Sequence, residues 1–192
     1  MKSTYICTAL IAVGLAGCAS PTPPTITAAD AEAAEAEATR VSALPITSAI
    51  NLPTGSATFE GKMGGGISGD IDGSILGDMS MSIQFDDNTI SGSVSNINYI
   101  DEDGDPDQLL GGSLTIAGAE TSGALSGTMK GTLSGVPDEA PIRGEASVNL
   151  SFDGNVVTDD SEGDSVYGTV TGSGDCDFEI YMDSGLFYGK QP

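Results

Sequence analysis

The feature that most constrains this chain is an alternation of residue types with a period of two. In "SGALSGTMKGTLSG", residues 122–135, glycine and a large apolar residue take turns on every second position, with mostly Ser, Thr or Lys between them. Successive side chains of a β-strand point to opposite faces, so Leu125, Met129 and Leu133 would share one face with the glycines. The segment "MSMSIQF", residues 79–85, alternates in the same way. The pattern predicts half-buried strands rather than helices.

Segments of this kind recur from about residue 55 to the end, which predicts an all-β fold. Eight antiparallel strands at even spacing favour a single closed up-and-down β-barrel, because closure removes exposed sheet edges. We therefore expect one soluble barrel domain over residues 53–192, with residues 155–158 as a short extra piece. The eight strands are expected at about residues 56–65, 74–85, 89–100, 111–118, 123–134, 142–152, 165–173 and 177–189.

Turn signals and barrel size refine this expectation. Hairpin turns are predicted at "FDDNT", residues 85–89, and at "FDGNV", residues 152–156, where Asp153-Gly154 is a two-residue turn signal. An eight-stranded barrel is just wide enough for its own side chains to fill it, so we expect interlocking side chains inside. A chain with no Trp, five Phe and five Tyr lacks the aromatic girdles of a transmembrane barrel.

The N-terminus is typical of an export signal with a lipid attachment site. Lys2 precedes a short apolar run, and "LAGC" ends at Cys18. This stretch resembles the bacterial lipobox, which predicts a signal peptide over residues 1–17 and a diacylglycerol and acyl lipid (palmitate) on Cys18. Ala19 stands where an Asp would retain the protein in the inner membrane, so we expect a lipid-anchored outer-membrane protein, facing either the cell surface or the periplasm.

Residues 18–52 are expected to form a flexible tether behind the lipidated cysteine. "SPTPPTIT" is rich in Pro and Thr, and "AADAEAAEAEATR" would present only alanine on its buried face. A helix there would be marginal in isolation.

Charge and cysteine content narrow the classes of partner. The chain has a net charge of −22, and removing residues 1–17 takes away Lys2 and leaves −23. Such a surface repels nucleic acid, so no nucleic-acid partner is expected. Once the signal and Cys18 are accounted for, Cys176 has no thiol to pair with, and its role stays open.

Two features bear on catalysis and metal binding. The chain has no histidine, which excludes the usual triads and zinc sites, and we expect no enzymatic activity and no cofactor. In "DEDGDPDQLL", the spacing of carboxylates fits the first ligands of a calcium loop, but Pro106 and Gly112 replace its Gly and Glu. We expect a solvated acidic turn and keep calcium as an alternative, with the ligands Asp101, Asp103, Asp105 and Asp107.

The loops of an up-and-down barrel alternate between its two ends. If the first strand starts from the tether side, the odd-numbered loops lie at the end distant from the membrane. We therefore expect an acidic distal rim that faces a basic protein or divalent cations. The rim contains Asp70, Asp72, Asp101–Asp107, Asp138, Glu139 and Asp175.

This layout resembles the barrel domain of transferrin-binding protein B and related surface lipoproteins. The similar stretches are "ATFEGKMGG", "MSIQFDDNTISGSV", "VYGTVTG" and "LFYGKQP", which span about residues 55–191. The chain departs from the family in having "SGDCDFE" after "VYGTVTG" and one barrel instead of two lobes. The resemblance implies an anchored binding or adaptor module, without transferrin binding. Two alternatives remain open, a lipocalin-like carrier of a small ligand and a structural envelope lipoprotein with calcium-stabilised loops.

Overall fold

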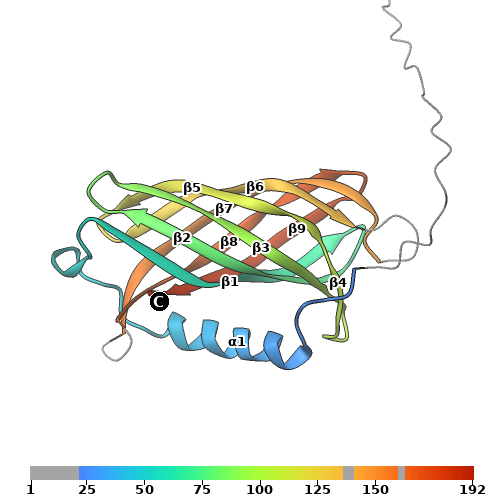
Figure 1. The fold of residues 1–192 in the computed structure, drawn as a ribbon, viewed down its shortest axis with the longest axis horizontal. Helices are drawn as coiled ribbons and strands as arrows, with labels where there is room; N and C mark the ends of the chain where they lie inside the picture. Colours follow the sequence, from blue (N-terminus) through green and yellow to red (C-terminus); the bar gives the residue numbers. More distant parts are fainter. Residues whose placement is uncertain (1–21, 136–140, 160–162) are drawn as a thin grey trace, which may run out of the picture.

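The computed structural model describes residues 22–135, 141–159 and 163–192, which form a β-barrel with one helix along its outside (Figure 1). The helix α1 spans Ala28–Ser42, and a 3₁₀ turn, η1, spans Ala49–Asn51. The strands are β1 (Ser56–Gly69), β2 (Gly73–Gln84), β3 (Thr89–Ile100), β4 (Pro106–Leu109), β5 (Gly111–Thr121), β6 (Ala124–Gly135), β7 (Gly144–Asp159), β8 (Gly163–Cys176) and β9 (Ile180–Lys190).

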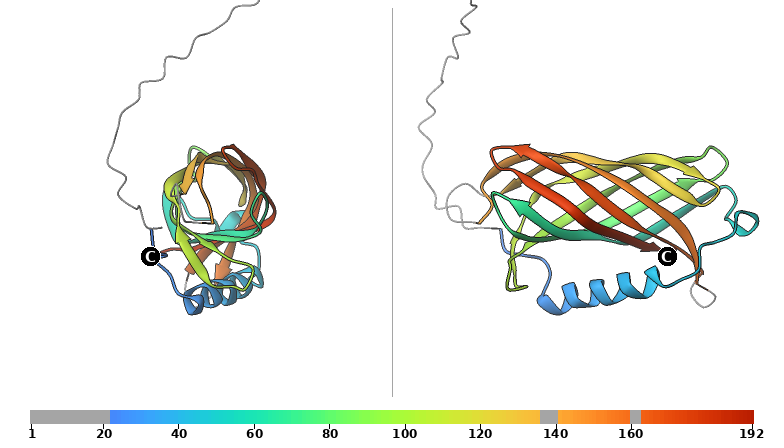
Figure 2. Two further views of the ribbon diagram at one scale, coloured as in Figure 1. Left: turned by 90° about the vertical axis from the view of Figure 1, so that its right-hand side faces the viewer. Right: turned by 180° about the vertical axis from the view of Figure 1, so that it is seen from behind.

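The expected eight-stranded antiparallel barrel is confirmed. Each long strand pairs with the next one along the chain, β3 pairs with β5, and β1 pairs with both β2 and β9, which closes the ring. The ring is visible end-on in the left view of Figure 2. The short strand β4 is additional and pairs with the last residues of β3.

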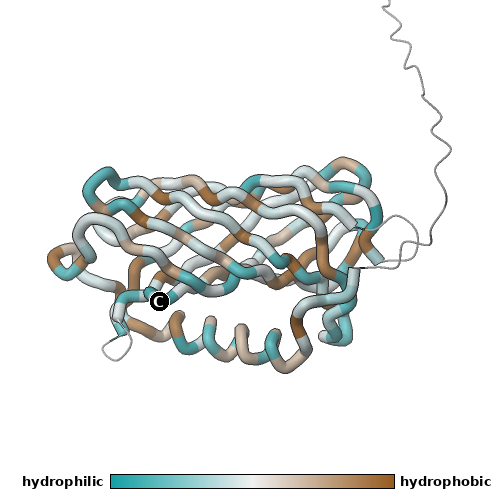
Figure 3. The backbone as a smooth tube through the Cα atoms, viewed as in Figure 1, coloured by the Kyte–Doolittle hydropathy of each residue, from teal (hydrophilic) through white to brown (hydrophobic). Residues whose placement is uncertain are grey.

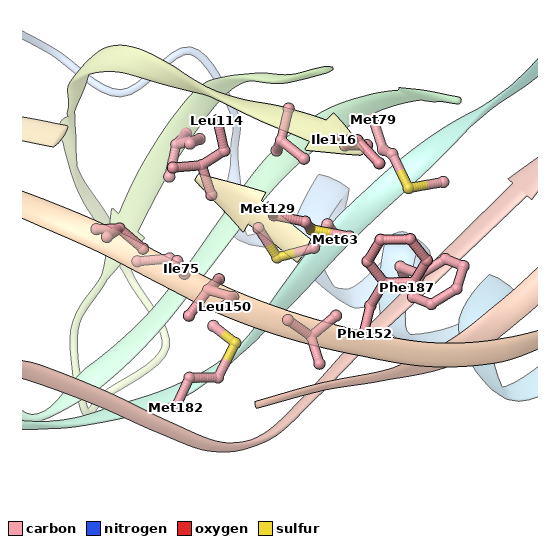
Figure 4. Close-up of a cluster of buried hydrophobic side chains, with 14 of the residues drawn as sticks. Met63, Ile75, Met79, Leu114, Ile116, Met129, Leu150, Phe152, Met182 and Phe187 are labelled. Carbon is pink, nitrogen blue, oxygen red and sulfur yellow. The ribbon is translucent and has the colours of Figure 1, made fainter. Parts of the chain in front are cut away.

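The interior of the barrel is packed with the apolar side chains of every second residue. Leu125, Met129 and Leu133 are buried as expected, and apolar and polar positions alternate along the strands in Figure 3. Side chains from strands on different sides of the ring point toward one another in the centre (Figure 4). One continuous cluster of thirty buried residues results, which includes four Phe and five Met side chains.

Glycines in the wall make room for the largest interior rings. Gly127 of β6 pairs with Gly118 of β5 on one side and with Phe152 of β7 on the other. A Cβ on Gly127 would lie 2.7 Å from the ring of Phe152. Phe152 in turn makes an edge-to-face contact with Phe187, with the ring centroids 5.6 Å apart. Interior glycine and interior aromatic residues therefore interlock.

The predicted turn at Asp153-Gly154 is wrong, because β7 continues through both residues to Asp159. Gly154 pairs with Gly168 of β8, and a Cβ on Gly154 would lie 2.7 Å from the ring of Phe187. The glycine thus serves ring packing within the wall rather than a chain reversal. The turn expected at residues 85–89 does join β2 to β3.

The helix α1 begins at a strong local start signal. The Thr27 side chain accepts a hydrogen bond from the Asp30 amide at 3.3 Å, and the Thr27 amide donates to the Asp30 carboxylate at 2.8 Å. This capping box satisfies two amide groups that a helix start leaves without partners. Asp30 in the first turn and Arg40 in the last turn also suit the helix dipole.

Tertiary contacts hold this helix on the barrel, which corrects the expectation of a flexible tether for the described residues 22–52. Val41 is fully buried against Val157 of β7 and Tyr188 of β9. Its neighbour Arg40 pairs with Asp159. A helix that is marginal alone is therefore stabilised by burial against a surface that the local sequence does not reveal.

The helix runs lengthwise along the outside of the barrel, and the segments before and after it reach opposite ends (Figures 1 and 2). Before it, the Thr22 carbonyl accepts a hydrogen bond from the Leu109 amide of β4 at 3.0 Å. After it, the Thr47 amide donates to the Val156 carbonyl at 2.9 Å, near the β5–β6 turn at Gly123. We call these two ends the β4 end and the opposite end.

Candidate binding groove between the helix and the barrel

A partly open groove of about 700 Å³ lies between α1 and the outer wall of the barrel. Its floor contains Leu76, Gly64 and Leu186, which are paired across β2, β1 and β9. Leu186 remains 37% exposed, which is unusual for a leucine between a sheet and a helix. The helix lines the other side with four alanines and four polar residues, namely Ala28, Ala31, Ala34, Ala38, Glu32, Glu35, Thr39 and Ser42.

A second hollow of about 460 Å³ adjoins the groove at the first half of α1 and the residues just before the helix. The two share Ala34, Lys62 and Tyr188 as lining residues. The second hollow is more polar, since Asp78 and other polar side chains line it. Together the lining residues of the two hollows extend along α1 from Ala28 to Ser42.

The groove exists because both of its surfaces carry small residues. The outer wall has "GGG" at Gly64–Gly66, and the facing side of α1 has alanine, so neither surface reaches the other. A Cβ on Gly66 would meet only the Gly73 carbonyl oxygen, at 3.8 Å, which shows how much room lies beside this position. Large side chains meet only near Val41. The helix is thus fastened near its C-terminal end, and the small-residue surfaces are left unfilled.

The one lysine in the lining is neutralised within the barrel wall. The Lys62 ammonium pairs with Asp78 on the neighbouring strand, and the Asn96 side-chain amide donates to the other Asp78 oxygen at 2.8 Å. Burial opposes the ionisation of Asp78, but the hydrogen bonds from Lys62 and Asn96 outweigh it and lower the pKa of this carboxyl. The positive charge of Lys62 is therefore committed to Asp78.

Four other carboxylates border the groove, two on α1 and two on the loop that leads into β4. They are exposed, and among the described residues no lysine or arginine forms an ion pair with them. The groove therefore combines an apolar floor with a negatively charged border. These residues are Glu32, Glu35, Asp103 and Asp105.

An ionic cluster beside the groove fastens the last turns of α1. Glu37 binds Arg40 and Lys190, each within 2.9 Å. The hydrogen bond from Arg40, together with Lys190, lowers the pKa of Glu37 to about 2. Burial, followed by the charge of Glu37, raises the pKa of the Tyr188 phenol. Glu37 is therefore ionised at neutral pH and holds the helix against β9.

The acidic loop singled out as a calcium alternative forms a tight turn of its own. One Asp101 carboxylate oxygen accepts hydrogen bonds from the amides of Asp103 and Asp105, at 3.0 and 2.9 Å. Asp107 lies beyond the turn, in β4. Across the described residues, no three acidic or cysteine side chains come together as metal ligands would. Asp103 and Asp105 instead border the groove.

The acidic loops do share one end of the barrel, but it is the end that the chain enters. The Asp70 carboxylate accepts a hydrogen bond from the Glu179 amide, which joins the β1–β2 and β8–β9 loops beside β4. Thr22 lies at this same β4 end, because α1 carries the chain back along the barrel before β1 begins. The premise that the first strand starts from the end at which the chain enters is therefore wrong, whereas the position of the rim relative to a membrane stays a prediction. Cys18, Asp138 and Glu139 lie outside the described residues.

Comparisons with known proteins add no family to this description. No protein-family model, no curated protein and no solved structure matches the chain. None of the described helices is both long and apolar enough to cross a membrane.

The groove could not be predicted from the sequence because its two surfaces are far apart in the chain. One signal was present, since Ala31, Ala34, Ala38 and Val41 follow the spacing of one helix face. That face packs on a sheet only if the helix returns along the barrel, which no local pattern indicates. The "GGG" of β1 likewise resembles flexible filler until it is seen beneath a helix.

Proposed function

We propose that this protein is a lipoprotein anchored to the outer membrane through Cys18, and that its barrel carries a binding site in the groove beneath α1. The observation that carries this proposal is the contrast between a packed interior and an open exterior groove. A cavity of about 700 Å³ is within the range of small-molecule sites, and its lining combines apolar side chains such as Leu76 and Leu186 with polar and charged ones. The barrel then serves as a rigid scaffold.

The anchor and the groove are compatible in space. Thr22 lies only four residues after Cys18, a span of at most about 14 Å. A lipid on Cys18 would therefore hold the β4 end toward the bilayer, with the acidic loops and one end of the groove facing it. This orientation replaces the distal rim as the expected membrane arrangement, and it leaves the opposite end free to meet a protein partner.

Among the alternatives, we still propose a carrier of a small ligand, but with the ligand outside the barrel. A lipocalin-like carrier would hold its ligand inside the barrel, where Phe59, Phe152 and Phe187 are buried. The groove offers such a ligand a site outside. Calcium-stabilised loops stay a proposal without a specific contact, since the Asp101 carboxylate is engaged in its own turn. We also infer a binding rather than a catalytic role.

Site-resolved NMR tests the proposed site. The full chain with Cys18→Ser, which lacks the lipid acceptor, is titrated with dodecyl maltoside below its micelle concentration. We expect the amide signals of Gly64–Gly66 and Leu186 to shift, and Gly66→Leu to abolish those shifts by filling the groove. Thr115→Leu adds the same side chain to an exposed position of β5 and should leave them unchanged. Shifts that persist in Gly66→Leu would overturn the groove as the site.

The anchor has its own test. Mass spectrometry of the mature protein should show a diacylglycerol-modified Cys18 as the first residue, and Cys18→Ser should move the protein out of the membrane fraction. An unmodified Cys18 would contradict the anchored form without affecting the groove.

A further inference from the structure

We infer that the groove beneath α1 selects amphiphiles with an apolar body and a cationic group. This inference rests on the proposed function, because it names the chemical class that the proposed site would bind. It follows from the distribution of apolar surface and charge around the groove.

The apolar body of the ligand would occupy the floor between Leu76 and Leu186. Both leucines point outward from the barrel on either side of Gly64, which has no side chain to separate them. The alanines of α1 cover this strip from above, so an inserted chain would contact apolar atoms on both sides. Removing Leu186 from water by such a ligand is favourable in proportion to the area covered.

The charge of the ligand would be set by the carboxylates at the border. Glu32 and Glu35 lie along the helix side, and Asp103 and Asp105 lie at the β4 end. No lysine or arginine within the described residues neutralises them. Lys62, the cation of the lining, is committed to Asp78. These carboxylates therefore attract a cationic group of the ligand, on the helix side or at the β4 end, more strongly than a neutral group.

The charge of the whole chain acts in the same direction. A net charge of −22 produces a negative potential that raises the local concentration of cations and lowers that of anions. This long-range effect alone does not distinguish the groove from other surfaces. The four carboxylates beside the apolar floor add a local attraction, which charge variants at the border measure.

The size of the groove favours a small molecule over a peptide segment. About 700 Å³ is the volume of a drug-sized site, whereas stable protein partners cover much larger areas. A basic peptide that bound the chain more tightly than the small cationic probe would contradict this part of the inference.

Three amphiphiles with the same tail separate the contribution of charge from that of apolar contact. Dodecyltrimethylammonium, dodecyl maltoside and dodecyl sulfate are titrated below their micelle concentrations into the full chain with Cys18→Ser, and groove amide shifts report binding. We expect the cationic probe to bind about tenfold more tightly than the neutral one, and the anionic probe most weakly. The cationic preference should shrink at high salt, because these carboxylates are exposed.

Matched charge variants show which carboxylates produce the preference for the cationic probe. Glu32→Gln with Glu35→Gln should weaken the cationic probe about threefold to tenfold and leave the neutral probe unchanged. Asp87→Asn with Asp153→Asn removes the same charge outside the groove and should change neither affinity appreciably. Equal binding of the cationic and neutral probes, or equal effects of the two double variants, would overturn the charge selection while the groove remained a binding site. If no probe shifted the groove amides, both the inference and the proposed function would fall.

Discussion

The inner wall of the barrel and its outer wall beneath α1 both combine glycine with large apolar residues, but with opposite results. Inside, Gly127 and Gly154 make room that the rings of Phe152 and Phe187 fill. Outside, the space beside Gly66 is left open, and a groove of about 700 Å³ remains, which α1 lines with alanines and with polar side chains such as Glu32 and Glu35. A glycine in a barrel wall thus produces either tight packing or an open site, and the facing residue decides which.

The largest expected effect is inside, where the rings fill the space. Phe152→Ala removes a fully buried ring that contacts Phe187, and we expect it to lower the free energy of unfolding by about 3–5 kcal/mol. Leu186→Ala, on the outer wall, should cost less than about 1 kcal/mol because that side chain is already partly in water. Urea unfolding measures both, and equal losses would remove the distinction between the two walls.

The next largest effect is expected from replacing a glycine of the inner wall, compared with one of the outer wall. Gly127→Val places a branched side chain against the Phe152 ring and the backbone of β5, and should cost about 3 kcal/mol. Gly66→Leu should change the free energy of unfolding by less than about 0.5 kcal/mol, since its side chain enters open space. Thermal unfolding of both variants checks the contrast. A strongly destabilised Gly66→Leu would show that the outer space is not available.

The attachment of α1 gives a smaller and more local effect. Val41→Ala removes two methyl groups from the contact with Val157 and Tyr188, which should weaken docking by about 2 kcal/mol. Hydrogen exchange should then speed up in α1 while the barrel amides stay protected. Thr39→Ala, at an exposed position of α1, serves as the control. Uniform acceleration across the barrel would mean that helix and barrel unfold as one unit.

The ionic cluster beside the groove should make this attachment sensitive to acid. Because the pKa of Glu37 is lowered to about 2, its contribution is complete above about pH 5 and is lost as the pH falls toward 2. We expect about 1–2 kcal/mol, less than the full shift implies, since the pair is partly exposed. Glu37→Gln should lose this stability at neutral pH and show a flatter profile between pH 5 and 2. The same dependence on pH in Glu37→Gln and in the parent chain would contradict this role of Glu37.

The strands could be predicted from the sequence because their cause is local. Alternation along "MSMSIQF" places Met79, Met81 and Ile83 inside, and the structure buries all three. The turn at Asp153-Gly154 could not be predicted correctly, because Gly154 is there for the ring of Phe187, a partner on a different strand. A tight turn and close packing against a distant ring both favour glycine, so the local sequence does not distinguish between them.

The site was less predictable than the fold for the same reason. The alanine face of α1 is visible in the sequence, but the surface it covers belongs to β1, β2 and β9, at least twenty residues later in the chain. The end of the barrel at which the chain enters was not predictable either, because it depends on this docking. The Thr22 carbonyl accepts a hydrogen bond from the Leu109 amide of β4, and an undocked tether would not hold Thr22 at that end.

The most direct test of the central claim uses the methionines as reporters of the interior. Met63, Met79, Met81, Met129 and Met182 are buried inside the barrel, and none of them lines the groove. With methyl-labelled methionine and dodecyltrimethylammonium, we predict that these methyl signals stay in place while the Gly64–Gly66 amides shift. Shifted methionine methyls beside unmoved groove amides would contradict the account and place the ligand in the interior.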